Sequence, residues 1–377
     1  MNCPPYYRPL IQPDDPCWRN WWLALLFMWA VPFVALLALW PEAQPRQQLW
    51  LWSAMAPSLW AVVVSLRFLG WRLALFEITT YRQTRAANTL RWWQRRQLSL
   101  PVQEVLLLGP AGDEQTRYQQ LMALAPVPLP VALPANTEGV LRCPLAMSGD
   151  GQRGVAVARH LARLTLALPA INEHWPSLRG IAWAGCAASQ AAFERALTDG
   201  GAVLPTPRMP LNNMAELDTL IDAFTRECRN QADWLLCAGV ASLEQTPHGQ
   251  LPGEGGFVWW IGWHGRMRLH RGESLPADTP ELAAKACMQV QRYAGLDSPP
   301  PECVAIGTAS QKAFVTGGWP VAEHQLGAHW GELDSLAPFI GMSLAMLQAG
   351  ETRQACGWLS QCDDQQVAIG MAVPYGD

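Results

Sequence analysis

The sequence predicts two transmembrane helices followed by one large soluble α/β domain. Three observations predict this fold class. Two uncharged apolar stretches lie close together before residue 70, arginines gather directly after the second, and short apolar runs then alternate with helix-like segments from about Leu100 onward. With 377 residues, half of them apolar, the chain can bury a sizeable core. Its net charge of -4 argues against a nucleic-acid-binding surface over the whole protein, so no nucleic acid partner is expected.

The first apolar stretch, Trp21–Trp40, has no charged residue. At about 1.5 Å per residue it is long enough to cross a hydrocarbon core of about 30 Å. Pro32 near its middle is tolerated in membrane helices and is expected to kink this one. A signal peptide is the alternative, but the stretch ends without an Ala-x-Ala type site and another apolar stretch follows at once. We therefore expect a transmembrane helix.

The second stretch, Leu49–Leu66, is also uncharged and just long enough to span. Pro41–Gln48 is a short polar turn between the two stretches, so the pair is expected to form a helical hairpin. Tryptophans collect near the ends of both stretches, as amphipathic indoles do at headgroup level. They are Trp18, Trp21, Trp40, Trp50 and Trp71. The alternative is two buried core helices of a soluble protein.

Arginines follow the second stretch with only one acid, Glu77, among them. They are Arg67, Arg72, Arg82, Arg85, Arg91, Arg95 and Arg96. The hairpin turn carries only Arg46, balanced by Glu42. Because basic residues beside membrane spans stay cytoplasmic, both termini are expected in the cytoplasm of a bacterial cell, with the chain in the inner membrane. The segment 68–98 is expected to be a helix along or leaving the anionic leaflet, or a solvated helical linker.

These features divide the chain into four parts: a cytoplasmic tail (residues 1–20), the transmembrane hairpin (21–66), a basic helix or linker (67–100) and the soluble domain (101–377). Within the domain, apolar runs predict strands at Val102–Gly109, Leu178–Ala184, Trp234–Gly239 and Gly256–Gly262. Helical patterns predict helices at Gln115–Ala125, Gly154–Leu168, Ala187–Thr198 and Met214–Cys228. This alternation predicts parallel pairing with helices on the sheet faces. Leu336–Leu347 has almost no polar face, which predicts a helix buried on most sides.

Ten cysteines without a CxxC pair fit a reducing compartment. Cys186, Cys237, Cys287 and Cys303 lie in apolar contexts and are expected to be small core residues. The seven histidines form no HxxxH or HExxH pattern, so no metal is predicted. No glycine-rich phosphate loop is present, and no cofactor is expected.

Two stretches resemble the β-ketoacyl synthase and thiolase-like superfamily. The first is Ala232–Leu243, followed by the turn Pro252-Gly253-Glu254-Gly255-Gly256 and an apolar strand. In that family a buried strand ends in small residues and a Pro-Gly-Glu-Gly turn starts the next strand. Small residues suit close backbone approach, and Glu254 is expected to bridge turn amides. Later segments fit the family as well, namely Pro301–Thr308, Gly327–Gln348 and Val367–Val373.

The resemblance covers roughly Asp150 to the C-terminus and leaves Pro101–Met147 unexplained. It implies a layered α/β/α domain. The family's chemistry needs a thiolate nucleophile at a strand-to-helix turn and two basic residues. The matching positions here are Asn213 for the nucleophile, Thr308 for the first histidine and Glu332 for the second. None of the three carries the family's group, so the resemblance implies a degenerate active site.

Cys186 offers an alternative nucleophile. Gly185-Cys186-Ala187 follows a predicted strand and opens a predicted helix, which is the local pattern of an acyl-enzyme turn with an activated thiol. His324 and His329 would then have to serve as bases. On this alternative the chain is an active membrane-bound β-ketoacyl synthase or acyltransferase. Otherwise Cys186 is a small residue beneath a helix end.

The function expected from these patterns is binding rather than catalysis. A thiolase-like domain that lost its nucleophile still offers a rigid scaffold, and a membrane hairpin places it beside an envelope assembly. We expect a protein partner in such a complex, with an accessory or adaptor role in type VI secretion as the first hypothesis. By analogy with the family, self-association through the thiolase-like domain is implied too.

Overall fold

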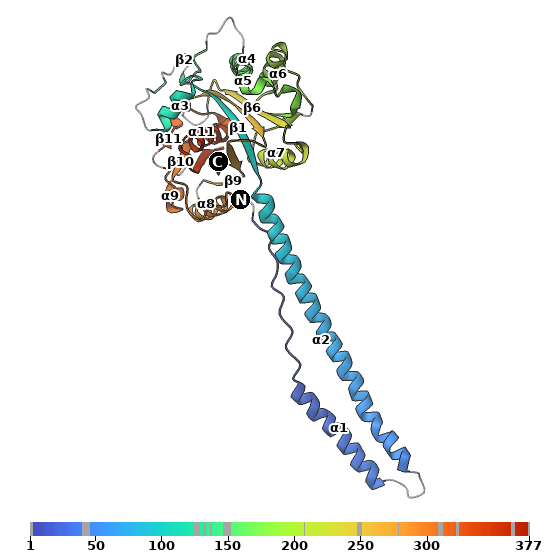
Figure 1. The fold of residues 1–377 in the computed structure, drawn as a ribbon. Coiled ribbons are helices and arrows are strands. Elements are labelled where there is room, and N and C mark those ends of the chain that lie inside the picture. Colours follow the sequence, from blue (N-terminus) through green and yellow to red (C-terminus); the bar gives the residue numbers. More distant parts are fainter. Residues whose placement is uncertain are drawn as a thin grey trace. The chain divides into compact units, whose positions relative to one another are not determined.

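The structure is a computed structural model. It describes residues 3–39, 46–123, 129–130, 133–135, 138–145, 152–206, 208–246, 251–277, 279–307, 312–321, 324–362 and 366–375. The chain divides into two compact units, one from Pro4 to Trp92 and one that begins at Trp93 and continues to the C-terminus. Each is described by itself below (Figure 1).

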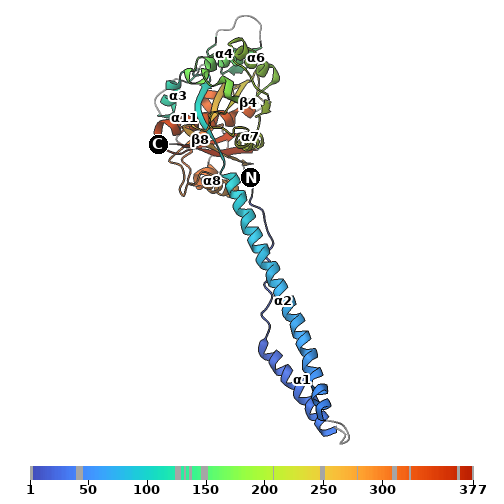
Figure 2. The ribbon, with the colours of Figure 1, turned by 45° about the vertical axis from the view of Figure 1, so that its right-hand side comes forward.

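The N-terminal unit is a helical hairpin. Helix α1 (Trp18–Leu39) continues through Pro32, and α2 (Arg46–Arg96) belongs to this unit as far as Trp92. Figure 2 shows α1 beside the first half of α2. Their aromatic side chains meet across the hairpin, with Trp22 against Trp60 at 6.2 Å and Phe33 against Trp50 at 5.4 Å between ring centroids. The two helices therefore run antiparallel, as the sequence predicts.

Both helices are long and apolar enough to cross a membrane. None of the residues in their apolar windows is buried in the protein, whereas the core helix of a soluble protein is mostly buried. Most of the predicted turn Pro41–Gln48 lies outside the described residues, which resume at Arg46. The predicted second span and the basic stretch after it form one continuous helix, so no separate linker begins at residue 67.

The N-terminal tail lies along the second half of α2. The ring of Tyr7 packs edge-on against Tyr81, and the Tyr81 hydroxyl donates a hydrogen bond of 2.9 Å to the carbonyl oxygen of Arg8. Where α1 begins, Trp18 lies 5.8 Å from Phe68. Tail and hairpin thus cover one face of α2, and Ile78 on that face is 8% exposed.

The larger unit is built on a mixed sheet of eleven described strands. The long strands are β1 (Ser99–Leu108), β4 (Leu178–Ala184), β6 (Trp234–Ser242), β7 (Glu254–Gly262), β10 (Glu302–Ile306), β12 (Cys356–Gln361) and β13 (Gln366–Pro374). The short strands are β5 (Arg208–Pro210), β8 (Met267–His270), β9 (Glu273–Pro276) and β11 (His324–Gln325). A separate hairpin pairs β2 (Leu133–Ala135) with β3 (Glu138–Val140).

The sheet order is β11-β10-β12-β13-β8-β1-β7-β6-β4-β5, with β9 beside β13. It contains a repeat. From β1 outward the first half runs β1-β7-β6-β4-β5, and from β8 outward the second half runs β8-β13-β12-β10-β11. When the strands of each half are counted in chain order, leaving out β9, both halves have the order first, fifth, fourth, second, third. The halves join where β1 pairs with β8. The predicted parallel pairing holds for β4 with β5 and β6, and for β10 with β11 and β12. It is wrong for β6 with β7 and β12 with β13, which are antiparallel; the described parts of the connections between them contain no crossover helix.

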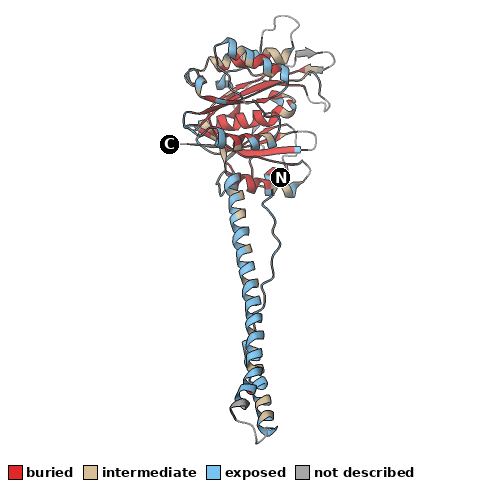
Figure 3. Cartoon of the chain, turned by 90° about the vertical axis from the view of Figure 1, so that its right-hand side faces the viewer, coloured by how far each residue is buried: buried red, intermediate tan, exposed pale blue. Residues whose placement is uncertain are grey.

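Helices cover this sheet in layers. They are α3 (Gln115–Met122), α4 (Arg153–Leu166), α5 (Pro169–Asn172), the 3-10 turn η1 (Trp175–Ser177), α6 (Ala187–Asp199), α7 (Met214–Glu227), α8 (Pro280–Tyr293), α9 (Lys312–Thr316), α10 (Gly327–Trp330), the 3-10 turn η2 (Asp334–Leu336) and α11 (Ala337–Thr352). One apolar core joins α7 and α11 to strands of both halves, and a second joins α4 and α6 to the other face of the first half. Figure 3 shows the buried residues concentrated in these strands and the enclosed helices.

Helix α11 confirms the predicted buried helix. Every residue from Ala337 to Ala349 is buried. The buried hydroxyl group of Ser343 in this helix makes two hydrogen bonds. Its Oγ donates to the Phe339 carbonyl oxygen at 2.7 Å and accepts from Trp259 Nε1 at 2.8 Å. A polar group in such a core must find partners, and this one has two.

The last turn of α2 belongs to the larger unit and is held there by buried charge. Arg96 is 7% exposed; it pairs with Glu273 at 2.8 Å and with Asp218 of α7. Glu273 also accepts a hydrogen bond of 2.6 Å from the Tyr293 hydroxyl. Arg95 pairs with Asp222, one helical turn beyond Asp218. Two of the seven arginines predicted to flank the membrane are therefore paired with carboxylates of the larger unit.

Candidate functional site

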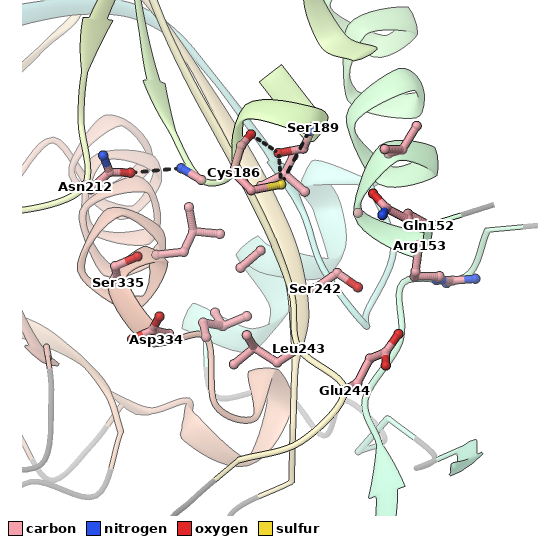
Figure 4. Close-up of a pocket in the computed structure, with 17 residues that line it drawn as sticks. Gln152, Arg153, Cys186, Ser189, Asn212, Ser242, Leu243, Glu244, Asp334 and Ser335 are labelled. Carbon is pink, nitrogen blue, oxygen red and sulfur yellow. Dashed lines mark hydrogen bonds between the residues drawn. The ribbon is translucent and has the colours of Figure 1, made fainter. Parts of the chain in front are cut away.

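A pocket of about 590 Å³ lies where α6 begins, beside the chain that leads into α7 and α11. Residues 152–155, 185–186, 189, 212, 240–244 and 333–336 line it. Figure 4 shows the side chains that these elements contribute, with Cys186 and Ser189 at the start of α6 and Asp334 and Ser335 before α11. The sequence analysis found one of these residues, Cys186.

Cys186 occupies this place because of the turn before it. β4 ends at Ala184, and Gly185 has a φ of +124°, which favours glycine. A Cβ at Gly185 would lie 2.4 Å from the Val240 carbonyl oxygen, so no larger residue fits without movement. The next residue, Cys186, is the N-cap of α6. Its Sγ accepts a hydrogen bond from the Ser189 amide at 3.5 Å and lies 3.2 Å from Ser189 Oγ.

This geometry favours the thiolate of Cys186. The Ser189 hydroxyl lowers the pKa of the Cys186 thiol below its ordinary value, and the amides of Ser189 and Ala188 act in the same direction. Cys186 is exposed, so the expectation that it is a small core residue is wrong. The reason is that the Gly185 turn directs the chain out of the apolar strand. Cys237, Cys287 and Cys303 are buried as predicted, and burial raises their thiol pKa values.

No histidine or lysine is among the described residues that line this pocket. His329 belongs to α10 and does not line it, and the side chain of His324 lies outside the described residues. The described structure therefore does not bring His329 to Cys186. Metal ligation has no candidate either, because no group of three or more His, Cys, Asp or Glu side chains suited to a metal ion occurs in the described parts of the chain.

A buried carboxylate, that of Glu254, holds two residues of the pocket lining in place. Glu254 is fully buried and accepts hydrogen bonds from Arg153 Nε at 2.9 Å and from Ser242 Oγ at 2.9 Å. It also accepts one from the Cys143 amide at 2.8 Å. Glu254 thus bridges the end of β6, the start of α4 and the segment before residue 145, rather than the amides of its own turn. Arg153, the cation on the pocket wall, is held by this carboxylate.

Asn213 stands at the N-cap of α7, which contributes to the same apolar core as α11. Its Oδ1 accepts a hydrogen bond of 2.9 Å from the Glu216 amide, and the Glu216 carboxylate in turn accepts one from the Asn212 amide. Asn212 Oδ1 in turn accepts from the Gly185 amide at 3.1 Å. Asn213 lines a smaller pocket of about 180 Å³, which shares Asn212 and Ser335 with the larger one. The two pockets therefore adjoin.

Glu332 lies between α10 and η2 and lines neither pocket. Its amide donates to the Leu251 carbonyl at 2.8 Å, and its carbonyl accepts from the Gly253 amide at 2.8 Å. Its carboxylate accepts from the Asp334 amide at 3.2 Å. Glu332 thus secures the loop that carries Asp334 and Ser335 into the site. Thr308 lies outside the described residues.

Sequence reasoning gave no role in the site to Ser189, Asn212, Arg153 or Ser242. For the first two a signal existed, because Ser189 comes three residues after the N-cap of α6 and Asn212 precedes the N-cap of α7. Polar side chains at the start of a helix commonly bind the backbone amides that have no partner within the helix, or bind the N-cap residue. Arg153 and Ser242 both bind Glu254, which lies 101 residues from Arg153 and 12 residues from Ser242 in sequence, and no local pattern encodes either contact.

No protein family model matches the chain, and no curated protein matches it. Solved structures do. The ishigamide ketosynthase/chain length factor is 14% identical with a TM-score of 0.51, over 74% of this chain and 100% of that one. A ketosynthase from module 6 of the bacillaene synthase of Bacillus subtilis 168 is 9% identical with a TM-score of 0.51, over 74% and 71% of the two chains. A ketosynthase from module 1 of the bacillaene synthase of Bacillus amyloliquefaciens FZB42 is 9% identical with a TM-score of 0.50, over 75% and 74%. The larger unit therefore has a ketosynthase-like fold, as the sequence resemblance predicts.

Proposed function

We propose that this chain is a membrane-anchored, non-catalytic ketosynthase-like protein that serves as a binding scaffold in a bacterial envelope assembly. One observation carries the proposal. The residue at the start of α7, where the resemblance expects the nucleophile, is Asn213, and its side chain is used to cap the helix. An amide cannot form the thioester that a condensing enzyme needs.

The anchoring part of the proposal is supported by the hairpin. Its apolar side chains are exposed on α1 and on the first half of α2, which suits lipid and not water. Arg67, Arg72, Arg82, Arg85 and Arg91 follow the second apolar stretch without a carboxylate bound to any of them in the described structure, so they support a cytoplasmic position for the larger unit. The inner membrane is the matching location.

The partner we propose is a protein of an envelope complex, with a type VI secretion apparatus as the first candidate. The pocket suits polar contacts, because Glu244, Asp334 and Asn212 line it together with the exposed thiol. A rigid α/β unit tied to the bilayer can hold such a surface next to other membrane components. Self-association through the larger unit is part of the same proposal.

A second candidate function is acyl transfer or condensation with Cys186 as nucleophile. The lowered pKa of its thiol and its exposed position on a pocket of about 590 Å³ favour it. The described lining offers no histidine or lysine, the basic residues that the family's chemistry uses, so this candidate ranks below the scaffold.

Intact-mass measurement separates the two functions. The full chain in nanodiscs is incubated with acyl-CoA and with acyl carrier protein carrying the same acyl group. We expect no adduct on the wild-type chain. An adduct that appears on the wild type and on Cys362→Ala, but is lost in Cys186→Ala, would establish the second candidate instead.

A cellular assay tests the scaffold itself. In a strain that lacks the gene, we expect Cys186→Ala to restore secretion of the assembly's effectors to the wild-type level. A chain lacking residues 21–66 should fail to restore it, because the soluble unit is released from the membrane. Failure of Cys186→Ala together with full activity of the truncated chain would contradict the proposal.

A further inference from the structure

The second half of α2 carries an exposed stripe of residues spaced alternately by three and four. The stripe consists of Leu66, Leu69, Leu73, Phe76, Thr80, Gln83, Ala87 and Leu90. All eight are exposed, and the large apolar ones are 55 to 71% exposed. The opposite face of the same helix is the one that the tail covers at Tyr81. A sustained three-four spacing is the pattern of the a and d positions of a coiled coil.

Lipid does not account for the whole stripe. The uncharged part of α2 ends before Arg67, so Leu73, Phe76 and Leu90 lie beyond the span among arginines. The alternative that this segment rests on the leaflet does not suit the structure, because α2 is drawn as one straight helix in Figures 1 and 2. A straight helix that crosses the bilayer cannot also lie along it. Apolar side chains left in water cost roughly 25 cal/mol per Å².

We infer that α2 of one copy pairs in parallel with α2 of a second copy of this chain, through the seam from Leu66 to Leu90. This inference rests on the proposed membrane anchoring. Two copies inserted in one membrane with the same topology have α2 helices that point the same way. Only a parallel pairing is then available, and a and d positions are matched in a parallel pair.

The charges beside the seam favour a second copy over another partner. With Leu66 at an a position, Arg72 is at g and Glu77 is at e. In a parallel coiled coil a g residue faces the e residue five positions later on the partner helix, so Arg72 of each copy faces Glu77 of the other. Glu77 is the only acid in residues 46–96 and is exposed. The other charged e position, Arg91, faces Ala86, so no like charges meet.

Disulfide cross-linking in membranes tests the seam. The full chain is prepared with Cys3, Cys17, Cys186 and Cys362 replaced by serine, since these are its exposed or partly exposed thiols. We expect Leu73→Cys and Phe76→Cys to form a dimer under mild oxidation. The controls Arg82→Cys and Arg85→Cys, which lie on the same helix away from the seam and are exposed, should form several-fold less. Equal cross-linking at all four positions would overturn the inference.

Charge exchange tests the choice of partner. Arg72→Glu and Glu77→Arg each place like charges at both symmetric contacts, and we expect each to weaken dimerisation about ten-fold, while the double variant restores it. Dimerisation is measured by single-molecule photobleaching in nanodiscs. A wild-type chain that stays monomeric, or a double variant as weak as the single ones, would refute the pairing. Extraction of the chain by alkaline carbonate would show instead that the anchoring has failed.

Discussion

Cys186 and Asn213 show what single residues can and cannot predict. Both were found from the sequence as residues that open helices, and both are N-caps in the structure. The exposure of Cys186 was not predictable, because the residues on either side of it are apolar or small and favour a core position. What decides its exposure is the positive φ of Gly185 and the carbonyl of Val240, which lies 55 residues away in sequence.

The thiol of Cys186 is expected to react at lower pH than an ordinary cysteine. The thiolate is the reactive form, and the Ser189 hydroxyl stabilises it, so the pKa is lowered and alkylation reaches half its maximum rate at a lower pH. Ser189→Ala removes the largest cause and should move this midpoint upward. Iodoacetamide labelling of the Cys186 peptide across pH, followed by mass spectrometry, measures it. Gln190→Ala on the same helix is the control, and an unchanged midpoint in Ser189→Ala would contradict the assignment.

At the scale of elements, long apolar runs were predictable and short strands were not. The predicted strand Leu178–Ala184 matches β4 to the residue, because seven residues in an apolar context leave little choice. Strands β5, β8, β9 and β11 have two to four residues each, too few for a period to be detected. Their pairing is decided by neighbouring strands. Arg95 and Arg96 were likewise assigned to the membrane flank, whereas Asp218, Asp222 and Glu273 bind them from distant segments.

A charge in the middle of α11 is expected to be severely destabilising. Leu344 is fully buried between strands of both halves of the sheet, so Leu344→Lys places an unpaired ammonium group in an apolar core at a cost of several kcal/mol. Urea unfolding of the full chain in detergent, followed by tryptophan fluorescence, should show the loss. Met288→Lys is the matched control, because Met288 on α8 is 62% exposed and should tolerate the change. Equal midpoints for Leu344→Lys and the wild type would show that the burial is wrong.

At the scale of the whole molecule, the division into an apolar hairpin and an α/β unit was predictable from composition alone. The order of the strands was not, because it depends on which edges meet after the helices have packed. The family resemblance supplied the layered arrangement for the part after Asp150, and β1, which precedes it, completes the centre of the sheet. A resemblance confined to local motifs could not place β1 there.

The topology of the chain in the membrane remains a prediction. We expect a green fluorescent protein fused after Asp377 to fluoresce and an alkaline phosphatase fused there to be inactive, because the arginines after Leu66 outnumber those of the hairpin turn. Shifting positive charge from the segment after Leu66 to the hairpin turn should partly reverse the behaviour of the two fusions. Replacing Arg67 and Arg72 with glutamine while adding two lysines next to Arg46 is the matched test. Active phosphatase on the unaltered chain would place the larger unit in the periplasm.

The equal strand order of the two halves has a consequence for the history of the molecule. Such a repeat is what duplication and fusion of a half-sized ancestral gene produce, so each turn in one half has a sister turn in the other. Gly185 after β4 corresponds to Gly307 after β10, and both have a positive φ. The residue that follows is a cysteine in the first half and Thr308 in the second. Each copy of the turn can therefore carry a different side chain while the glycine before it has the same backbone conformation.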